Sequence, residues 1–164
     1  MYLWNIKALK AELAADTVTE PQVFIYFLAV LTLETVLYQM TPLFPSSSDS
    51  NFWDYAGFAG TVVLTVGGTL VAYRQNGGNA GRAFLTRFFP LLWVLTIRFL
   101  VFLLPVLVLA MAPVAYFSDS LFGAETQDGD FNLLSMVVAM LSMGWLLVFY
   151  YRLAVHMRAV ARGV

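Results

Sequence analysis

Two charged residues lie deep inside long apolar stretches of the sequence, and they are the strongest candidates for chemistry. Glu34 lies within residues 22–41, and Arg98 lies within residues 88–112. A charge at such depth in a membrane is costly and by default marks a functional site with a partner. At 1.5 Å per helical residue, Glu34 lies roughly 19 Å and Arg98 roughly 15 Å from the inner ends of their stretches. We therefore hypothesise an intramembrane ion pair between Glu34 and Arg98.

Three interpretations of these two residues stay open. A buried ion pair can fix which helix packs on which without adding much stability. The same groups can instead serve a transport or proton pathway. They can also have separate fates, with the Arg98 side chain extending to the inner membrane surface.

Small residues recur along the second apolar stretch. Gly57, Thr61 and Thr65 are spaced four apart, so they begin on one helical face and drift slowly around it. This pattern favours close helix packing, with the hydroxyls bonded to backbone groups. A hydroxyl-lined polar path is the alternative. The residues expected to pack are Gly57, Gly60, Thr61, Thr65, Gly67 and Gly68.

The other chemical signals are weaker. His156 is the only histidine, which is poor support for a haem or metal site. Methionines in the fourth stretch favour core packing over contact with a quinone or lipid tail. An enzyme acting on lipid would have to use Asn76, Asn79, Arg82, Arg87 and His156. We predict no catalytic residue, no metal and no cofactor.

The composition is that of a membrane protein. Hydrophobic residues make up 60% of the 164 residues and charged residues only 12%, with a mean hydropathy of +0.77. Soluble domains carry about 25% charged residues, so the excess apolar surface must face lipid or protein partners. The net charge of -1 gives no reason to expect a nucleic-acid partner.

Four stretches are long enough to cross a bilayer core of ~30 Å as helices. They cover residues 22–41, 55–73, 88–112 and 132–151. Within the third stretch, Pro105 predicts a kink, and Pro113 predicts its end. The fold expected is an all-α integral membrane protein with one domain over residues 1–164.

Positive charge is confined to alternate connections. Two acidic connections, with Asp49 and Asp54 in the first, hold no lysine or arginine. By the positive-inside rule both termini are cytoplasmic, and we expect a multi-pass protein of a bacterial inner membrane. The basic residues expected at the inner interface are Lys7, Lys10, Arg74, Arg82, Arg87, Arg152, Arg158 and Arg162. The second acidic connection holds Asp119, Glu125, Asp128 and Asp130.

Residues 1–20 predict a short amphipathic helix lying in the inner membrane interface. Leu3, Ile6, Leu9 and Leu13 approximate a helical stripe, while Lys7, Lys10 and Glu12 can face water. The two lysines suit an anionic inner leaflet. The simpler alternative is a short frayed helix leading into the membrane. A second interfacial piece is expected over residues 80–89, with Arg82 and Arg87 reaching lipid phosphates.

The leading functional hypothesis is a non-enzymatic membrane scaffold, accessory subunit or regulator that acts through helix contacts. Its partners would be the bilayer and either further copies of the chain or another membrane protein. The alternative is a small oligomeric channel or transporter for protons, ions or a small solute, with Glu34 and Arg98 near the pathway.

Overall fold

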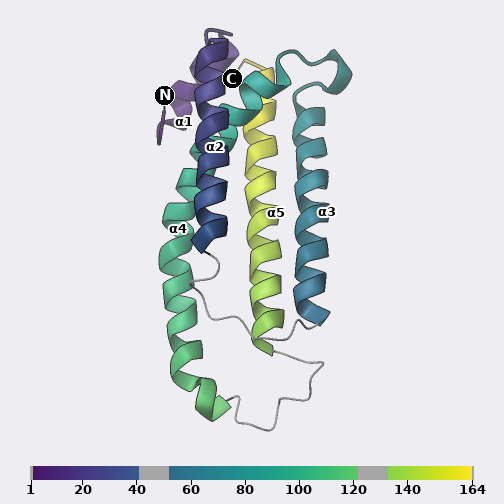
Figure 1. Ribbon diagram of the computed structural model, residues 1–164. Helices are drawn as coiled ribbons and strands as arrows, with labels where there is room; N and C mark the ends of the chain where they lie inside the picture. Colours follow the sequence, from purple (N-terminus) through teal and green to yellow (C-terminus); the bar gives the residue numbers. More distant parts are fainter. Residues whose placement is uncertain (1, 41–51, 122–132, 164) are drawn as a thin grey trace.

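The computed structural model is built from helices (Figure 1) and describes residues 2–40, 52–121 and 133–163, without a strand in these ranges. Thr41, Asn132 and the acidic residues Asp49, Glu125, Asp128 and Asp130 lie outside the described residues. The elements are α1 (Ile6–Ala14), α2 (Glu20–Met40), α3 (Phe52–Gln75), the 3-10 helix η2 (Gly78–Ala80), α4 (Phe84–Leu121) and α5 (Leu133–Ala161).

Four of these helices are long and apolar enough to cross a membrane. The qualifying segments are Glu20–Gln39, Phe52–Gln75, Phe84–Leu103 and Met136–Ala161, and each overlaps one predicted stretch. The prediction of an all-helical chain with four helices able to span a membrane is therefore confirmed. The two chain ends lie at the same end of the bundle (Figure 1), as an even number of spans requires.

Helix α4 departs most from the expected boundaries. It begins four residues earlier than Phe88 and continues to Leu121, so Pro113 does not end it. Proline removes a backbone donor, but apolar helices tolerate it when neighbouring groups or local adjustments satisfy the freed carbonyl. With 38 residues, α4 is about 57 Å long at 1.5 Å per residue, and it follows a curved path in Figure 1.

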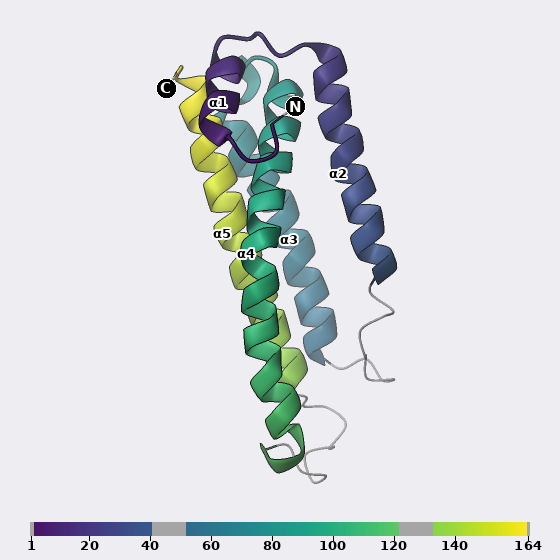
Figure 2. The same ribbon diagram turned by 90° about the vertical axis from the view of Figure 1, so that its left-hand side faces the viewer.

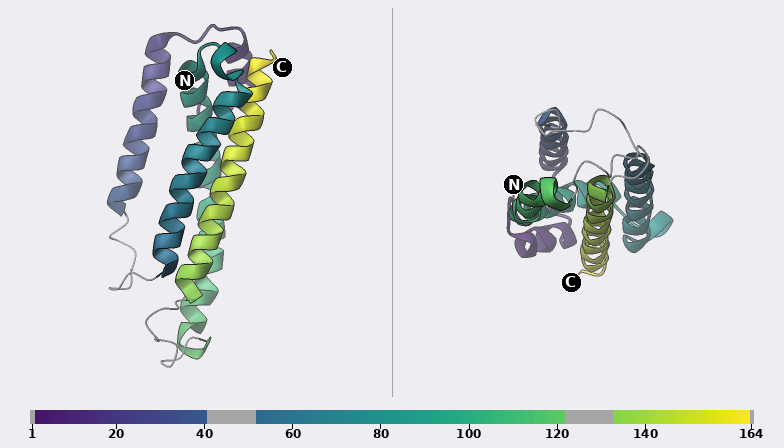
Figure 3. Two further views of the ribbon diagram at one scale, coloured as in Figure 1. Left: turned by 90° about the vertical axis from the view of Figure 1, so that its right-hand side faces the viewer. Right: turned by 90° about the horizontal axis from the view of Figure 1, so that it is seen from below.

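Helices α3 and α5 form the most extensive helix pair and lie side by side along their length (Figure 3). Glycines of α3 allow this close approach. A Cβ atom added at Gly60 would overlap the Met143 side chain, and one added at Gly68 would overlap the Tyr150 ring. The side chains of α5 therefore occupy the space that side chains at these α3 positions would need.

The rest of the small-residue set divides between two faces of α3. Gly57 also faces α5, because an added Cβ would lie 3.2 Å from the Cβ of Ala139. A Cβ atom added at Gly67 would have no neighbouring atom within 4 Å. Thr61 and Thr65 are exposed. The expected packing face thus reaches α5 through Gly57, Gly60 and Gly68, while Thr61, Thr65 and Gly67 lie away from it.

The largest part of the buried core lies at the end of the bundle that holds α1 (Figure 2). Asn5 caps α1, its side-chain oxygen accepting the Ala8 N–H at 3.1 Å. Ile6, Leu9 and Leu13 of α1 are buried. The helix expected in residues 1–20 is present as Ile6–Ala14, and protein covers these three residues of the stripe that we expected to face lipid, whereas Leu3, before the helix, is exposed. The cluster around it includes Leu91, Val94, Leu95, Leu153, Met157 and Val160 of α4 and α5.

Helix α2 stands at the edge of the molecule. It packs against α4 and makes no comparable contact with another described helix, and Figures 2 and 3 show it apart from α3. Tyr26 and Val30 are buried, and the ring of Phe27 meets Phe89 edge-on at 4.8 Å between centroids. The rest of α2 exposes large apolar side chains, among them Phe24, Ile25, Leu28 and Leu31.

The adjacent glycines Gly67 and Gly68 provide a matched test of the α3–α5 interface. Gly68→Ala should lower the free energy of unfolding by about 1–3 kcal/mol, because the added methyl overpacks against the Tyr150 ring. Gly67→Ala should be neutral or stabilise by up to about 1 kcal/mol, because alanine favours helix and the site is open. Unfolding by SDS titration in detergent micelles measures both. Equal effects of the two substitutions would contradict this packing.

Candidate functional site

Arg98 is held by the N-terminal segment of the chain and not by Glu34. Its Nε donates a hydrogen bond to the Trp4 carbonyl oxygen at 3.1 Å, and its Nη2 donates to the same oxygen. The guanidinium carbon lies 5.2 Å from the centroid of the Trp4 ring, within the range of a cation–π interaction. The expected ion pair is therefore replaced by a neutral backbone acceptor, brought to α4 by residues 2–5.

Glu34 occupies a different environment. Its side chain is exposed on α2, and in the described part of the chain the only ion pair joins Arg87 to Asp16. The structure thus does not bring Glu34 and Arg98 together. Of the three interpretations drawn from the sequence, the geometry corresponds to separate fates for Glu34 and Arg98. The Arg98 side chain binds the Trp4 carbonyl and not the membrane surface.

Residues 2–5 cross from α2 to α4 and connect three helices (Figure 2). The Tyr2 N–H donates to the Tyr26 hydroxyl of α2 at 2.6 Å, and the Tyr2 hydroxyl donates to Glu12 Oε1 of α1 at 2.6 Å. The Tyr2–Glu12 hydrogen bond raises the pKa of Tyr2 above its usual value. The Trp4 ring lies beside Phe102 of α4 with centroids 6.3 Å apart. We did not anticipate this segment, because its acceptor for Arg98 is a backbone group.

A second polar cluster surrounds Arg87 at the start of α4. Arg87 Nη1 donates to Asn76 Oδ1 at 3.2 Å, and Nη2 donates to Asp16 Oδ1 at 3.1 Å. Asn76 Nδ2 in turn donates to the Arg82 carbonyl at 3.0 Å. The expectation that Arg87 reaches lipid phosphates is wrong, because Arg87 and Asn76 are both buried and join α4 to the α3–α4 and α1–α2 connections.

The α3–α4 connection has the backbone geometry needed to hold Asn76 in place. Gly77 and Gly78 have φ of 104° and 58°, a region that glycine enters without steric cost. A Cβ atom at Gly81 would overlap the Asn76 carbonyl oxygen. The tight turn folds back on Asn76 and directs its side chain to the Arg82 carbonyl and Arg87.

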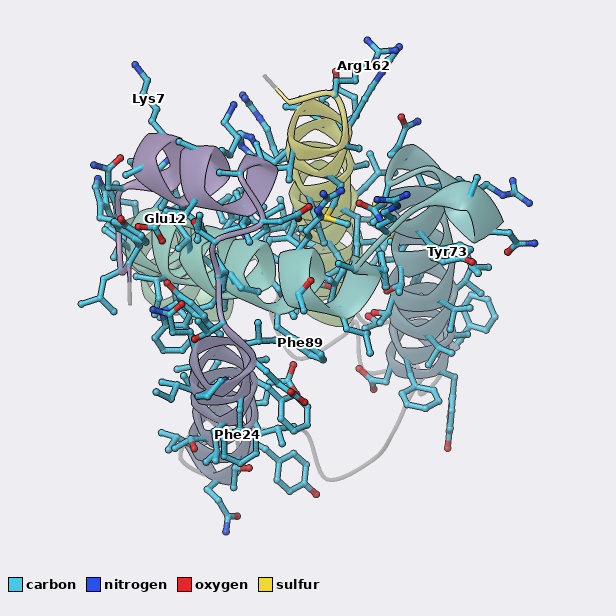
Figure 4. The ribbon with its side chains drawn as sticks, turned by 90° about the horizontal axis from the view of Figure 1, so that it is seen from above. Lys7, Glu12, Phe24, Tyr73, Phe89 and Arg162 are labelled. Carbon is cyan, nitrogen blue, oxygen red and sulfur yellow. The ribbon has the colours of Figure 1, made fainter. Side chains whose placement is uncertain are left out.

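The eight basic residues predicted for one interface belong to elements that gather at one end of the bundle. These are α1, the end of α3, the α3–α4 connection, the start of α4, the end of α5 and the residue that follows it (Figures 1 and 4). Lys10 is half-buried and Arg87 is buried. The exposed members of the set are Lys7, Arg74, Arg82, Arg152, Arg158 and Arg162.

The polar residues considered for lipid chemistry do not converge on one point. Asn76 and Arg87 share the buried cluster, whereas the side-chain oxygen of Asn79 accepts a hydrogen bond from the Tyr73 hydroxyl at 2.8 Å. His156 is half-buried on α5 and close to the charges of Lys10, Arg98 and Arg152. Within residues 2–40, 52–121 and 133–163, no group of three His, Asp or Glu side chains could hold a metal ion.

No protein-family model, curated protein or solved structure matches this chain. The function must therefore be inferred from the chain's own residues, above all from the different environments of Glu34, Arg87 and Arg98.

The buried cluster is tested by comparing two asparagines of the same connection. Asn76→Ala should lower the free energy of unfolding by about 1–3 kcal/mol, because Arg87 and the Arg82 carbonyl each lose a hydrogen-bond partner. Asn79→Ala should change it by no more than about 0.5 kcal/mol, because Asn79 is exposed. The same SDS titration in micelles compares them, and a larger loss at Asn79 would count against the cluster.

Proposed function

We propose that this chain is a non-enzymatic, multi-pass protein of a bacterial inner membrane that acts as a scaffold, accessory subunit or regulator. In this proposal α2 is the helix that meets the partner, and both termini are cytoplasmic. The observation that carries the proposal is Glu34, an exposed carboxylate on an apolar helix that packs against α4 at the edge of the molecule.

Glu34 lies deep within the membrane-spanning segment proposed for α2. Glu34 lies 14 residues beyond the start of α2 at Glu20, which is about 21 Å along the helix in a bilayer core of ~30 Å. A carboxylate facing lipid at this depth is strongly unfavourable. A hydrogen-bond donor or cation on a neighbouring helix would remove most of this cost, because charge-assisted hydrogen bonds are stronger than neutral ones.

The two threonines next to Glu34 do not require such a partner. The Thr32 hydroxyl donates to the Leu28 carbonyl and the Thr35 hydroxyl to the Leu31 carbonyl, each at 2.8 Å. These bonds within α2 are the usual way in which a membrane helix accommodates threonine. Apart from the exposed Tyr38, one turn further along, the surface of α2 around Glu34 is therefore largely apolar. A complementary helix can cover a face of this kind.

The membrane orientation in this proposal is supported by charge. The basic residues belong to the elements at one end of the bundle, and short cytoplasmic connections carry the excess of lysine and arginine in membrane proteins. Asp54 lies at the opposite end of the bundle, in the first turn of α3. This distribution supports a cytoplasmic location for α1, the α3–α4 connection and the end of α5.

A second candidate function is a small oligomeric channel or transporter, and the same carboxylate favours it. If copies of the chain assemble around α2, Glu34 would line a hydrated path, where a carboxylate is stable and can carry protons or bind cations. Arg98 would influence such a path only from α4, since its guanidinium is bound to Trp4.

Cysteine crosslinking tests α2 as the contact helix, and the absence of cysteine from the sequence makes single-cysteine variants direct. Leu31→Cys on α2 is compared with Val63→Cys on α3; both native side chains are exposed, and both lie about 17 Å from the starts of their helices. Oxidation or a bifunctional maleimide in native membranes should crosslink Leu31→Cys efficiently and Val63→Cys weakly. Equal or absent crosslinking at both positions would overturn the assignment of α2.

Glu34→Gln in the Leu31→Cys background tests the role of the carboxylate. Association should weaken by about tenfold, because a charge-assisted hydrogen bond is replaced by a weaker neutral one. Glu20→Gln is the matched control, since Glu20 is an exposed carboxylate in the first turn of the same helix, and it should leave the crosslinked fraction unchanged. An unchanged fraction with Glu34→Gln would show that this carboxylate does not bind the partner.

The channel alternative predicts a different readout of the same variants. Reconstituted in liposomes, the unmodified chain and Glu20→Gln should conduct protons or cations, and Glu34→Gln should abolish the flux because the titratable group is lost. Flux that is absent from the unmodified chain, or that survives Glu34→Gln, would remove this candidate and leave the partner-binding proposal standing.

A further inference from the structure

A groove lies between α1 and Gly163, which is two residues past the end of α5, at the end of the bundle where the basic residues gather. Its volume is about 610 Å³, and it is lined by Lys7, Lys10, Ala11, Ala14, Ala15 and Gly163. The lining thus combines two lysine side chains with three alanines and a glycine. It involves neither α2 nor Glu34, so what it binds is independent of the proposed partner contact.

The positive charge of this region extends beyond the two lysines. Arg162 directly precedes the lining residue Gly163 in the chain and is exposed. In Figure 4, Lys7 and Arg162 extend on the side of α1 and α5 that faces away from α2.

The acidic residues of α1 and of the α1–α2 connection do not neutralise this charge. Glu12 lies on the side of α1 nearer to α2 (Figure 4), where it accepts the Tyr2 hydroxyl. Asp16 accepts from Arg87 and forms an ion pair with it at 3.1 Å. The groove therefore presents excess positive charge to whatever approaches it.

A smaller cavity next to Arg87 is a weaker candidate for an anion. It measures about 170 Å³, and its lining includes Asp16, Thr86 and Arg87. Both terminal nitrogens of Arg87 already donate to Asn76 and Asp16. An anion there would have to displace Asp16, whereas the ammonium groups of Lys7 and Lys10 donate no hydrogen bond and form no ion pair in the described part of the chain.

We propose that the groove between α1 and Gly163 binds the phosphate headgroup of an anionic phospholipid from the leaflet at the basic end of the bundle. Lysine ammonium groups bind phosphate as point charges, and basic pockets beside membrane helices bind such headgroups. Exposed side chains of α5, among them Val148, Tyr151 and Val155, lie in the segment that is long and apolar enough to cross a membrane, where the acyl chains of a bound lipid would lie.

Lipid titration of the full-length protein tests the proposal. Detergent-solubilised protein is titrated with phosphatidylglycerol or phosphatidylcholine, and bound lipid is counted by native mass spectrometry. The Lys7→Gln/Lys10→Gln variant should lose affinity for phosphatidylglycerol by about tenfold or more. The Arg74→Gln/Arg82→Gln control removes the same charge from exposed residues at the same end and should change affinity by less than about twofold.

Further arms separate the possible outcomes. Lys7→Arg/Lys10→Arg should keep phosphatidylglycerol binding, which shows that loss in the glutamine variant does not come from misfolding. Equal losses in the two glutamine variants would reduce the effect to general charge and overturn the site. Undiminished binding by Lys7→Gln/Lys10→Gln would also overturn it. Glycerol phosphate that binds as tightly as phosphatidylglycerol would replace the lipid with a soluble phosphate ester and overturn the lipid assignment.

Discussion

A charged group on an apolar helix needs hydrogen-bond partners from protein or water, because lipid tails provide none. Arg98 obtains its partner from the Trp4 carbonyl, and this requires the chain before α1 to run back along α4. Arg87 obtains its partners from Asn76 and Asp16, and this ties both polar connections at the basic end to the start of α4. Much of the architecture at this end brings protein acceptors to these two guanidinium groups, although Arg87 Nε is buried without a hydrogen-bond partner in the described part of the chain.

The same constraint separates the molecule into two parts. At the basic end, α1 and residues 2–5 cover the surfaces of α4 and α5, and the side chains there form a dense core. Further along, the helices are joined mainly through the glycine contacts of α3 with α5, and among the described helices α2 packs mainly against α4. A densely packed end and one helix, α2, with few contacts are compatible with the proposed assembly with other membrane helices. Glu34 lies on α2.

The sequence predicts the helices well because a long apolar run has few other structures available in a membrane. It does not predict what covers each face. The stripe of Ile6, Leu9 and Leu13 indicates a helix with one apolar side, but an apolar side packs equally well on lipid and on α4. Gly67 and Gly68 are neighbours in sequence, yet only Gly68 meets α5, because the direction a helix faces is set by its partner.

The arginines show the same limit for polar residues. The pairing of Arg98 with Glu34 was inferred from depth alone, and depth does not reveal a backbone acceptor such as Trp4. Arg87 is 71 residues from Asp16 in the chain, so no local pattern connects them. Sequence reasoning identifies which groups need partners in an apolar setting, whereas the partner itself depends on long-range packing.

The unequal lengths of the spanning helices have a consequence for the surrounding bilayer. Helix α2 is 21 residues long, about 32 Å, whereas α4 is about 57 Å, longer than a bilayer core of ~30 Å even when tilted. Lipid around the protein would therefore contact a short helix at α2 and a longer helix at α4. Hydrophobic mismatch of this kind costs fractions of a kcal/mol per Å. A neighbouring protein with the complementary profile would relieve that deformation, so the membrane itself would favour association.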